Sequence, residues 1–67
     1  MIVVMINGKD CSFEEEMNVA DILALLDIQE PAIAVALNME VVPKSEHGRT
    51  IVHHGDRMEI IRPVQGG

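Results

Sequence analysis

The last two residues of the chain carry their chemistry in the backbone rather than in side chains. Gly66 and Gly67 follow Val64 and Gln65, and Gly67 presents an unhindered carboxylate. Two glycines contribute nothing to a core, and glycine loses more backbone freedom than any other residue when it is held in place. A carboxylate becomes a good electrophile only when one oxygen is made a leaving group, and adenylation with ATP achieves this. A sulfur nucleophile can then displace AMP, so the pattern predicts a protein that is the substrate of a partner enzyme and carries sulfur at Gly67.

Conventional catalytic side chains form no convincing group in this sequence. Cys11 is the only cysteine, and we expect a half-buried structural thiol rather than a nucleophile. His53 and His54 are neighbours, with His47 nearby, and a strand would direct the two neighbours to opposite faces. We therefore expect solvated turn histidines, no metal site and no catalytic residue. No glycine-rich loop joins a strand to a helix, so we expect no bound cofactor, and ATP would be used by the activating partner.

Composition and charge narrow the class of protein further. The chain has 67 residues, 48% of them hydrophobic, and Phe13 is its only aromatic residue. A single small domain with an aliphatic core follows from this, because one cysteine allows no internal disulfide. Eleven acidic and five basic residues give a net charge of -6, which repels nucleic acids and anionic membranes. With no basic leader and no apolar run of membrane-spanning length, we expect a cytoplasmic protein without nucleic-acid or membrane partners.

The first half of the chain predicts a hairpin followed by a helix. Residues 1–6 form an apolar run of strand length, and Asn7-Gly8 then favours a type I′ turn into a returning strand at 9–13. From Val19 the apolar period changes to that of a helix, with Asn18 as the N-cap. We expect this helix to have ended by Gln29, because a proline follows two residues later.

The second half predicts further strands and hence a fold. Apolar runs at 32–38, 41–42 and 57–61 give the order β-β-α-β-β-β, and residues 51–54 form one more short extended piece. A crossover helix lets the first and last strands lie parallel and side by side. We therefore predict an α+β fold of the β-grasp, ubiquitin-like type, with a mixed sheet of four to five strands and one main helix on one face. The domain is expected at 1–63 and a flexible tail at 64–67. The predicted core residues are Ile2, Val4, Ile6, Val19, Ile22, Leu23, Leu26, Val35, Leu37, Met58 and Ile60.

Four segments together resemble a known family. They are "VMINGKD" at the start, "MNVADILALL" in the helix, "AVALNMEVVPKS" in the middle and "HHGDRMEIIRPVQGG" at the end. In this order and at this length they resemble the ubiquitin-like sulfur carrier proteins of the ThiS family. The resemblance implies that an E1-like adenylyltransferase (ThiF-type) adenylates Gly67 and that a thiocarboxylate results. It also implies a sulfur donor such as a cysteine desulfurase, and a thiazole synthase (ThiG-type) that receives the sulfur for the thiazole of thiamine.

Other proteins would suit the same tail. The small subunit of molybdopterin synthase also ends in Gly-Gly and bears a thiocarboxylate, although it is typically longer and more helical. A ubiquitin-like modifier, joined to lysines of target proteins, is a second alternative. An interaction module with a frayed end is a third, because chain ends are often poorly ordered.

The outer face of the sheet is the expected docking surface. If Ile6 and Met58 face the helix, strand alternation directs Val3, Met5 and Ile61 away from it. Because the first and last strands should be neighbours, these three apolar side chains are expected to cluster near the root of the tail. Affinity for a partner would then come from this patch rather than from the tail, since ordering a flexible segment costs conformational entropy.

Overall fold

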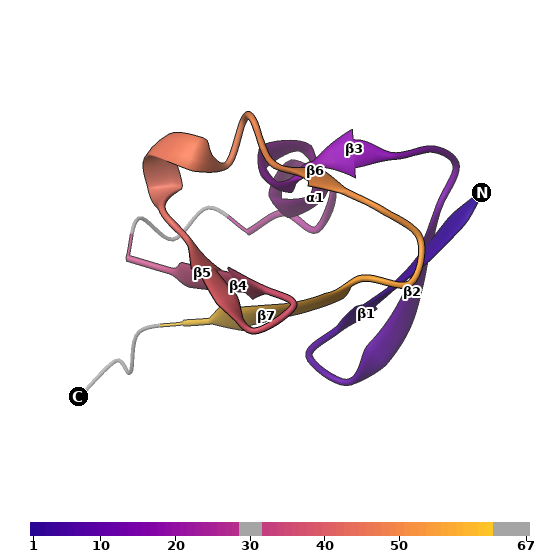
Figure 1. Cartoon of the computed structure of the whole chain (residues 1–67), viewed down its shortest axis with the longest axis horizontal. Helices are drawn as coiled ribbons and strands as arrows, with labels where there is room; N and C mark the ends of the chain where they lie inside the picture. Colours follow the sequence, from indigo (N-terminus) through magenta and orange to yellow (C-terminus); the bar gives the residue numbers. More distant parts are fainter. Residues whose placement is uncertain (29–31, 63–67) are drawn as a thin grey trace.

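The protein folds around a main mixed β-sheet with an α-helix against one face (Figure 1). The computed structural model describes residues 1–28 and 32–62, so the predicted tail at 64–67 lies outside the described residues. Within them the main sheet has five strands in the order β2-β1-β7-β4-β5, and a second sheet pairs β3 with β6. The elements are β1 (Ile2–Ile6), β2 (Lys9–Phe13), β3 (Met17–Asn18), α1 (Val19–Leu25), β4 (Ala34–Leu37), β5 (Glu40–Val42), the 3-10 turn η1 (Lys44–Glu46), β6 (Ile51–Val52) and β7 (Arg57–Ile61).

The predicted N-terminal hairpin is confirmed. β1 pairs with β2 in antiparallel register from Ile2 opposite Phe13 to Ile6 opposite Lys9. Asn7 and Gly8 connect the strands with φ angles of 50° and 83°. Two successive positive φ values are what a type I′ turn requires, and this turn matches the natural twist of the two strands.

The first and last strands lie parallel and side by side, as predicted, and the last strand occupies the centre of the sheet. β7 runs parallel to β1, with Ile6 beside Met58, and antiparallel to β4, with Val35 beside Ile60. The crossover that makes β1 and β7 parallel contains α1, which covers one face only (Figure 1). The strand that leads to the C-terminal residues is therefore held on both sides.

The helix begins where the sequence indicates. Asn18 is the N-cap, and its Oδ1 accepts a hydrogen bond of 2.7 Å from the backbone N–H of Asp21. This bond satisfies one of the backbone donors that have no partner in the first turn of a helix. Within residues 1–28 and 32–62, no helix is long and apolar enough to cross a membrane.

The end of the helix differs from the expectation for Leu26. The helix stops at Leu25, and Asp27 adopts the left-handed conformation with φ 57°. Ile28 then donates from its N–H to the carbonyl of Leu23 at 2.9 Å, and Asp27 donates to Ala24 at 3.1 Å. These two bonds are those of a Schellman motif, in which the residue three before the C-cap and the residue two after it usually also make a hydrophobic contact. Leu26 is consequently exposed and Ile28 is buried in its place.

A small second sheet was not predicted. Met17 pairs with Val52 and Asn18 with Ile51, so β3 and β6 join the entrance of the helix to the loop before β7. Met17 packs against the core and Val52 is fully buried. Strands of two residues are too short to show a period of two, so only the long-range pairing reveals them.

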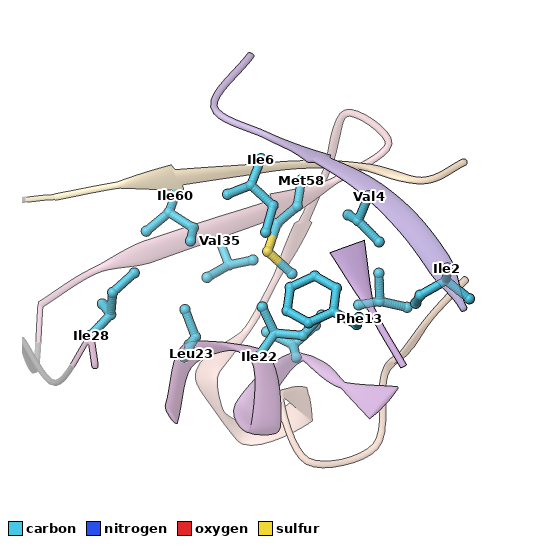
Figure 2. Packing of buried hydrophobic residues seen from close by; sticks show 12 residues of the cluster. Ile2, Val4, Ile6, Phe13, Ile22, Leu23, Ile28, Val35, Met58 and Ile60 are labelled. Atoms are coloured by element: carbon cyan, nitrogen blue, oxygen red, sulfur yellow. The ribbon is translucent and has the colours of Figure 1, made fainter. Parts of the chain in front are cut away.

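The core lies between the sheet and α1 (Figure 2). Side chains of the strands that face the helix pack against side chains of the helix that face the sheet, and among the described residues no disulfide contributes to this core. Most of the predicted core is confirmed, but Leu37 is only partly buried, Leu26 is exposed, and Phe13, Ile28 and Val52 are additional members. The buried cluster contains Ile2, Val4, Ile6, Phe13, Val19, Ile22, Leu23, Ile28, Val35, Val52, Met58 and Ile60.

Candidate functional site

The described structure ends at the base of the predicted reactive segment. Ile61 is the last residue of β7 and Arg62 is the last described residue, so the chain beyond them starts from the centre of the sheet. The functional positions predicted from sequence in this segment lie outside the described residues; they are Val64, Gln65, Gly66 and Gly67. The part of the site with known geometry is therefore the end of β7 and its surroundings.

Two asparagine side chains hold β7, one near each end. Near its start, Asn38 Oδ1 accepts from the N–H of Arg57 at 3.0 Å, and Asn38 Nδ2 donates to Asp56 Oδ1 at 3.1 Å. Near its end, Asn7 Oδ1 accepts from the N–H of Ile60 at 2.8 Å, and Asn7 Nδ2 donates to the carbonyl of Ile60 at 3.2 Å. The residue types at Asn7-Gly8 indicate a turn only, and the second role of Asn7 depends on a contact with Ile60, 53 residues along the chain.

The predicted docking residues do not form one cluster. Val3, Met5 and Ile61 all belong to the outer face, as strand alternation predicts. However, the parallel register places Met5 beside Arg57, four residues before Ile61. Four residues of strand span about 13 Å, so Ile61 lies well beyond the end of the β1–β7 pairing. The expectation of adjacency was wrong because the turn at Asn7 takes β1 away from β7 before Ile61 is reached.

Ile61 instead shares the outer face with apolar side chains of β4 and β5, and Glu59 lies beside Ala36 on the same face. The register places Ile61 beside Ala34 and, one step along the sheet, Ala36 beside Val41. Ile61 is 59% exposed and Val41 is 75% exposed. We call this surface the outer-face patch and define it as Ala34, Ala36, Val41 and Ile61. Large exposed apolar side chains grouped on one face are typical of interaction sites.

A pocket of about 420 Å³ opens beside the end of β7, on the side of the sheet opposite to the outer-face patch. Ile6, Ile60 and Ile28 contribute apolar lining, and Arg62 lies at the same pocket. Cys11 is half-buried and lines it as well, with its Sγ 3.7 Å from the carbonyl oxygen of Lys9. The only cysteine is thus much nearer to the end of β7 than its position in the sequence suggests.

Replacement of Cys11 should nevertheless leave sulfur loading unchanged. We expect Cys11→Ala to form a C-terminal thiocarboxylate at the wild-type rate, because the proposed chemistry uses the Gly67 carboxylate and no side-chain sulfur. The stability should fall by about 1 kcal/mol at most, since a half-buried thiol packs as a small apolar group. Intact-mass measurement of loading over time and a thermal melt test both points. A folded Cys11→Ala variant that cannot be loaded would show that the thiol takes part as a persulfide or disulfide.

The histidine pair after β6 makes contacts that sequence alone could not show. His54 Nδ1 accepts a hydrogen bond of 3.0 Å from the N–H of Val3. His53 Nε2 lies 3.8 Å from a carboxylate oxygen of Glu16, and its Nδ1 lies 3.8 Å from one of Asp56. Both histidines are exposed, as predicted, and they join the loop to neighbouring elements.

His47 corrects the expectation of solvated histidines. It is buried, and its Nε2 lies 3.2 Å from the carbonyl of Val42, to which it donates. Its backbone carbonyl also accepts from the N–H of Ala20 in α1, so it joins the loop to the sheet and the helix. Across residues 1–28 and 32–62, no group of three histidine, cysteine or acidic side chains is arranged to hold a metal ion.

Strand order and the position of the last strand define the class of protein. A mixed sheet with parallel central strands, a helix in the crossover and a central last strand that leads to the C-terminal residues is a β-grasp of the ubiquitin-like class. The model of the ThiS family matches residues 4–67, and the chain belongs to this family.

Solved structures agree with this family. A crystal structure of the thiamine biosynthesis protein ThiS from Geobacter metallireducens superposes with a TM-score of 0.86 at 29% identity, covering 98% of this chain and 100% of that one. A solution structure of a thiamine biosynthesis protein from the same organism gives a TM-score of 0.83 at 29% identity, covering 98% of this chain and 88% of that one.

Sequence relatives include one much longer protein. The sulfur carrier protein ThiS of Escherichia coli is 25% identical over 96% of this chain and 97% of its own length. A thiazole synthase of Paramagnetospirillum magneticum is 36% identical over 96% of this chain, which spans only 20% of that relative. The family and these relatives identify a sulfur carrier of thiamine biosynthesis, a carrier protein rather than an enzyme.

Proposed function

We propose that the carboxylate of Gly67 is the group that carries sulfur. A carboxylate oxygen attacks the α-phosphorus of ATP in a partner enzyme, and pyrophosphate leaves. A sulfide nucleophile then adds to the carbonyl carbon of the acyl-adenylate, and AMP leaves with the oxygen, so that one carboxylate oxygen is replaced by sulfur. The observation that supports this site most directly is the family match, which continues through residue 67.

The proposal divides the chain into a folded domain at 1–63 and a reactive tail at 64–67. The tail would follow a strand that is paired on both sides in the described structure, and this supports a rigid base with a free end. The proposed partners are an E1-like adenylyltransferase of the ThiF type, a sulfur donor such as a cysteine desulfurase, and a thiazole synthase of the ThiG type. The thiazole synthase of Paramagnetospirillum magneticum supports the last of these, because a segment similar to this chain forms part of it.

Mass spectrometry of the intact chain tests the reaction. The protein is incubated with a ThiF-type enzyme, ATP and sulfide, and the mass should increase by the difference between sulfur and oxygen. Omission of ATP should prevent the increase, because the oxygen must first be made a leaving group. Transfer to a thiazole synthase should then restore the original mass. If a stable conjugate with lysines of other proteins formed instead, the chain would be a modifier.

We further propose that the outer-face patch docks the activating enzyme. Val3 and Met5 belong to the same outer face but are half-buried, and Met5 lies beside Arg57. They are therefore expected to contribute less than Ile61 and Val41. The net charge of -6 would favour a basic surface on the partner and would increase the encounter rate at low salt.

Substitution of the patch should weaken binding. We expect Ile61→Ser and Val41→Ser each to raise the dissociation constant for the activating enzyme by roughly tenfold, because each removes apolar area that binding would bury. Leu25→Ser is the matched control, since Leu25 is 64% exposed but lies on α1, away from the outer face. Calorimetric titration measures binding, and circular dichroism confirms the fold. Equal losses in all three variants, or no loss in any, would place the docking surface elsewhere.

A further inference from the structure

Asn7 stands where β1 separates from β7. Up to this point the two strands form a regular parallel ladder, in which the N–H of Met5 donates to Asp56 and the N–H of Asn7 donates to Met58, both at 3.0 Å. In one more step of this ladder, the N–H of Ile60 would donate to the backbone carbonyl of residue 7, and the N–H of residue 9 would donate to the carbonyl of Ile60. That step is absent, because the backbone turns at Asn7 and Gly8 and residue 9 pairs with Ile6 in the hairpin.

The Asn7 side chain supplies the missing step. Its Oδ1 accepts from the N–H of Ile60 at 2.8 Å, and its Nδ2 donates to the carbonyl of Ile60 at 3.2 Å. A carboxamide has the same donor and acceptor as a peptide group, so it continues the ladder by one residue after the β1 backbone has left. Ile60 keeps both backbone groups paired on the β1 side, as part-buried groups require.

We propose that Asn7 is a positioning residue for the reactive end of the chain. It holds the backbone of Ile60 in the sheet and so fixes the position and direction of Ile61 and Arg62. The residues after Arg62 therefore begin from a fixed point. This inference rests on the proposed function, in which the far end of that chain reacts in the active site of a partner. Without the side-chain bonds, the end of β7 opens locally, and the end of the chain samples a larger volume. The fraction of docked complexes with the reactive group in place then falls.

The effect should appear in kcat more than in KM. The outer-face patch does not include Asn7, so docking continues when the Asn7 bonds are lost. Presentation of the reactive group after docking becomes less frequent, and this lowers the rate of the step that follows binding. An overall loss of stability would lower the amount of folded protein and would not separate an effect on kcat from an effect on KM.

Asn7→Gly and Asn38→Gly form a matched pair of variants. Both residues occupy turns with nearly equal positive φ, 50° and 51°, which glycine adopts without strain. Each substitution removes two side-chain hydrogen bonds. Asn7 loses two bonds to the backbone of Ile60, near the end of β7. Asn38 loses one bond to the backbone of Arg57, at the start of β7, and one to the carboxylate of Asp56. Asn7→Asp is a third variant, because its carboxylate can accept from the N–H of Ile60 but would lie against the carbonyl of Ile60.

We call the two hydrogen bonds between the Asn7 side chain and the backbone of Ile60 the clamp. Amide hydrogen exchange tests this clamp directly. We expect exchange at Ile60 to become roughly tenfold faster in Asn7→Gly, the equivalent of about 1.4 kcal/mol. In Asn38→Gly the increase should appear at Arg57 and not at Ile60. Unchanged exchange at Ile60 in Asn7→Gly would overturn the inference whether or not the protein carries sulfur.

Thiocarboxylate formation by a ThiF-type enzyme tests the positioning role. We expect kcat to fall roughly tenfold in Asn7→Gly and Asn7→Asp with KM changed less than twofold, and both to stay near wild type in Asn38→Gly. Equal losses in Asn7→Gly and Asn38→Gly, or full activity in Asn7→Gly with faster exchange at Ile60, would overturn the positioning role. If the wild-type chain forms no thiocarboxylate, the proposed function fails, and exchange at Ile60 alone decides the clamp.

Discussion

A chain that lacks Gly67 should keep its fold and lose thiocarboxylate formation completely. The buried cluster extends from Ile2 to Ile60, so removal of the last residue takes no side chain from the core. The reacting carboxylate, however, would now be one residue too short to reach the position that the partner's ATP site requires. A displacement of this size has a large effect, because a misplacement of about 1 Å can already reduce a rate about a hundredfold. Intact mass after incubation with the activating enzyme, ATP and sulfide measures the loss.

Two further variants separate the length of the tail from its chemistry. A C-terminal tag converts the carboxylate of Gly67 into an amide and should abolish loading, whereas the same tag at the N-terminus should not. Gly66→Val leaves the carboxylate in place but adds a β-branched side chain that restricts the backbone and widens the tail, so loading should be strongly impaired. A C-terminally tagged protein that is shown to be uncleaved and still gains sulfur would refute a terminal carboxylate as the carrier.

Replacement of Met58 by alanine should cause the largest loss of stability among the single substitutions considered. Met58 is 0% exposed and stands on the central strand, beside Ile6 of β1 and Leu37 of β4. Met→Ala at a buried site costs about 2–5 kcal/mol, because the lost apolar contacts are not replaced and a cavity remains. A loss of about 3 kcal/mol should lower the melting temperature by roughly 15 °C in a domain of this size.

Met39 provides the matched control for this substitution. It is 88% exposed in the turn between β4 and β5, so Met39→Ala makes the same chemical change without creating a cavity. Its free energy of unfolding should stay within about 0.5 kcal/mol of wild type. Urea denaturation of both variants gives the comparison, and similar losses at the two positions would contradict the packing shown in Figure 2.

Local signals account for the parts of the fold that were predicted correctly. Asn7-Gly8 specifies a turn through the φ angles of those two residues, and Asn18 caps a helix through a bond to Asp21 three residues away. Alternation in β1 and β7 places one set of side chains in the core because a strand has a period of two. Each of these signals acts within a few residues, so it can be read without knowledge of the rest of the chain.

The errors came from features in which a local signal was weak or a distant contact decided the outcome. The helix ends before Gln29, as predicted, but Asp27 takes a left-handed conformation that glycine more often adopts. The burial of Ile28 instead of Leu26 was therefore missed. β3 and β6 are too short to show a period, and their pairing joins residues more than thirty positions apart.

The sequence by itself determined the order of the elements, most of the core and the presence of Gly66-Gly67 as a chemical feature, because these depend on residue type and local spacing. Only the tertiary structure decided how β1 and β7 align, and therefore that Ile61 lies beside Ala34 and not beside Met5. The same alignment brings Asn7 to Ile60 and turns a hairpin residue into a support for the end of the last strand. The physical reason is that strand register depends on the packing of the whole buried face, whereas a turn or a cap depends on its immediate neighbours.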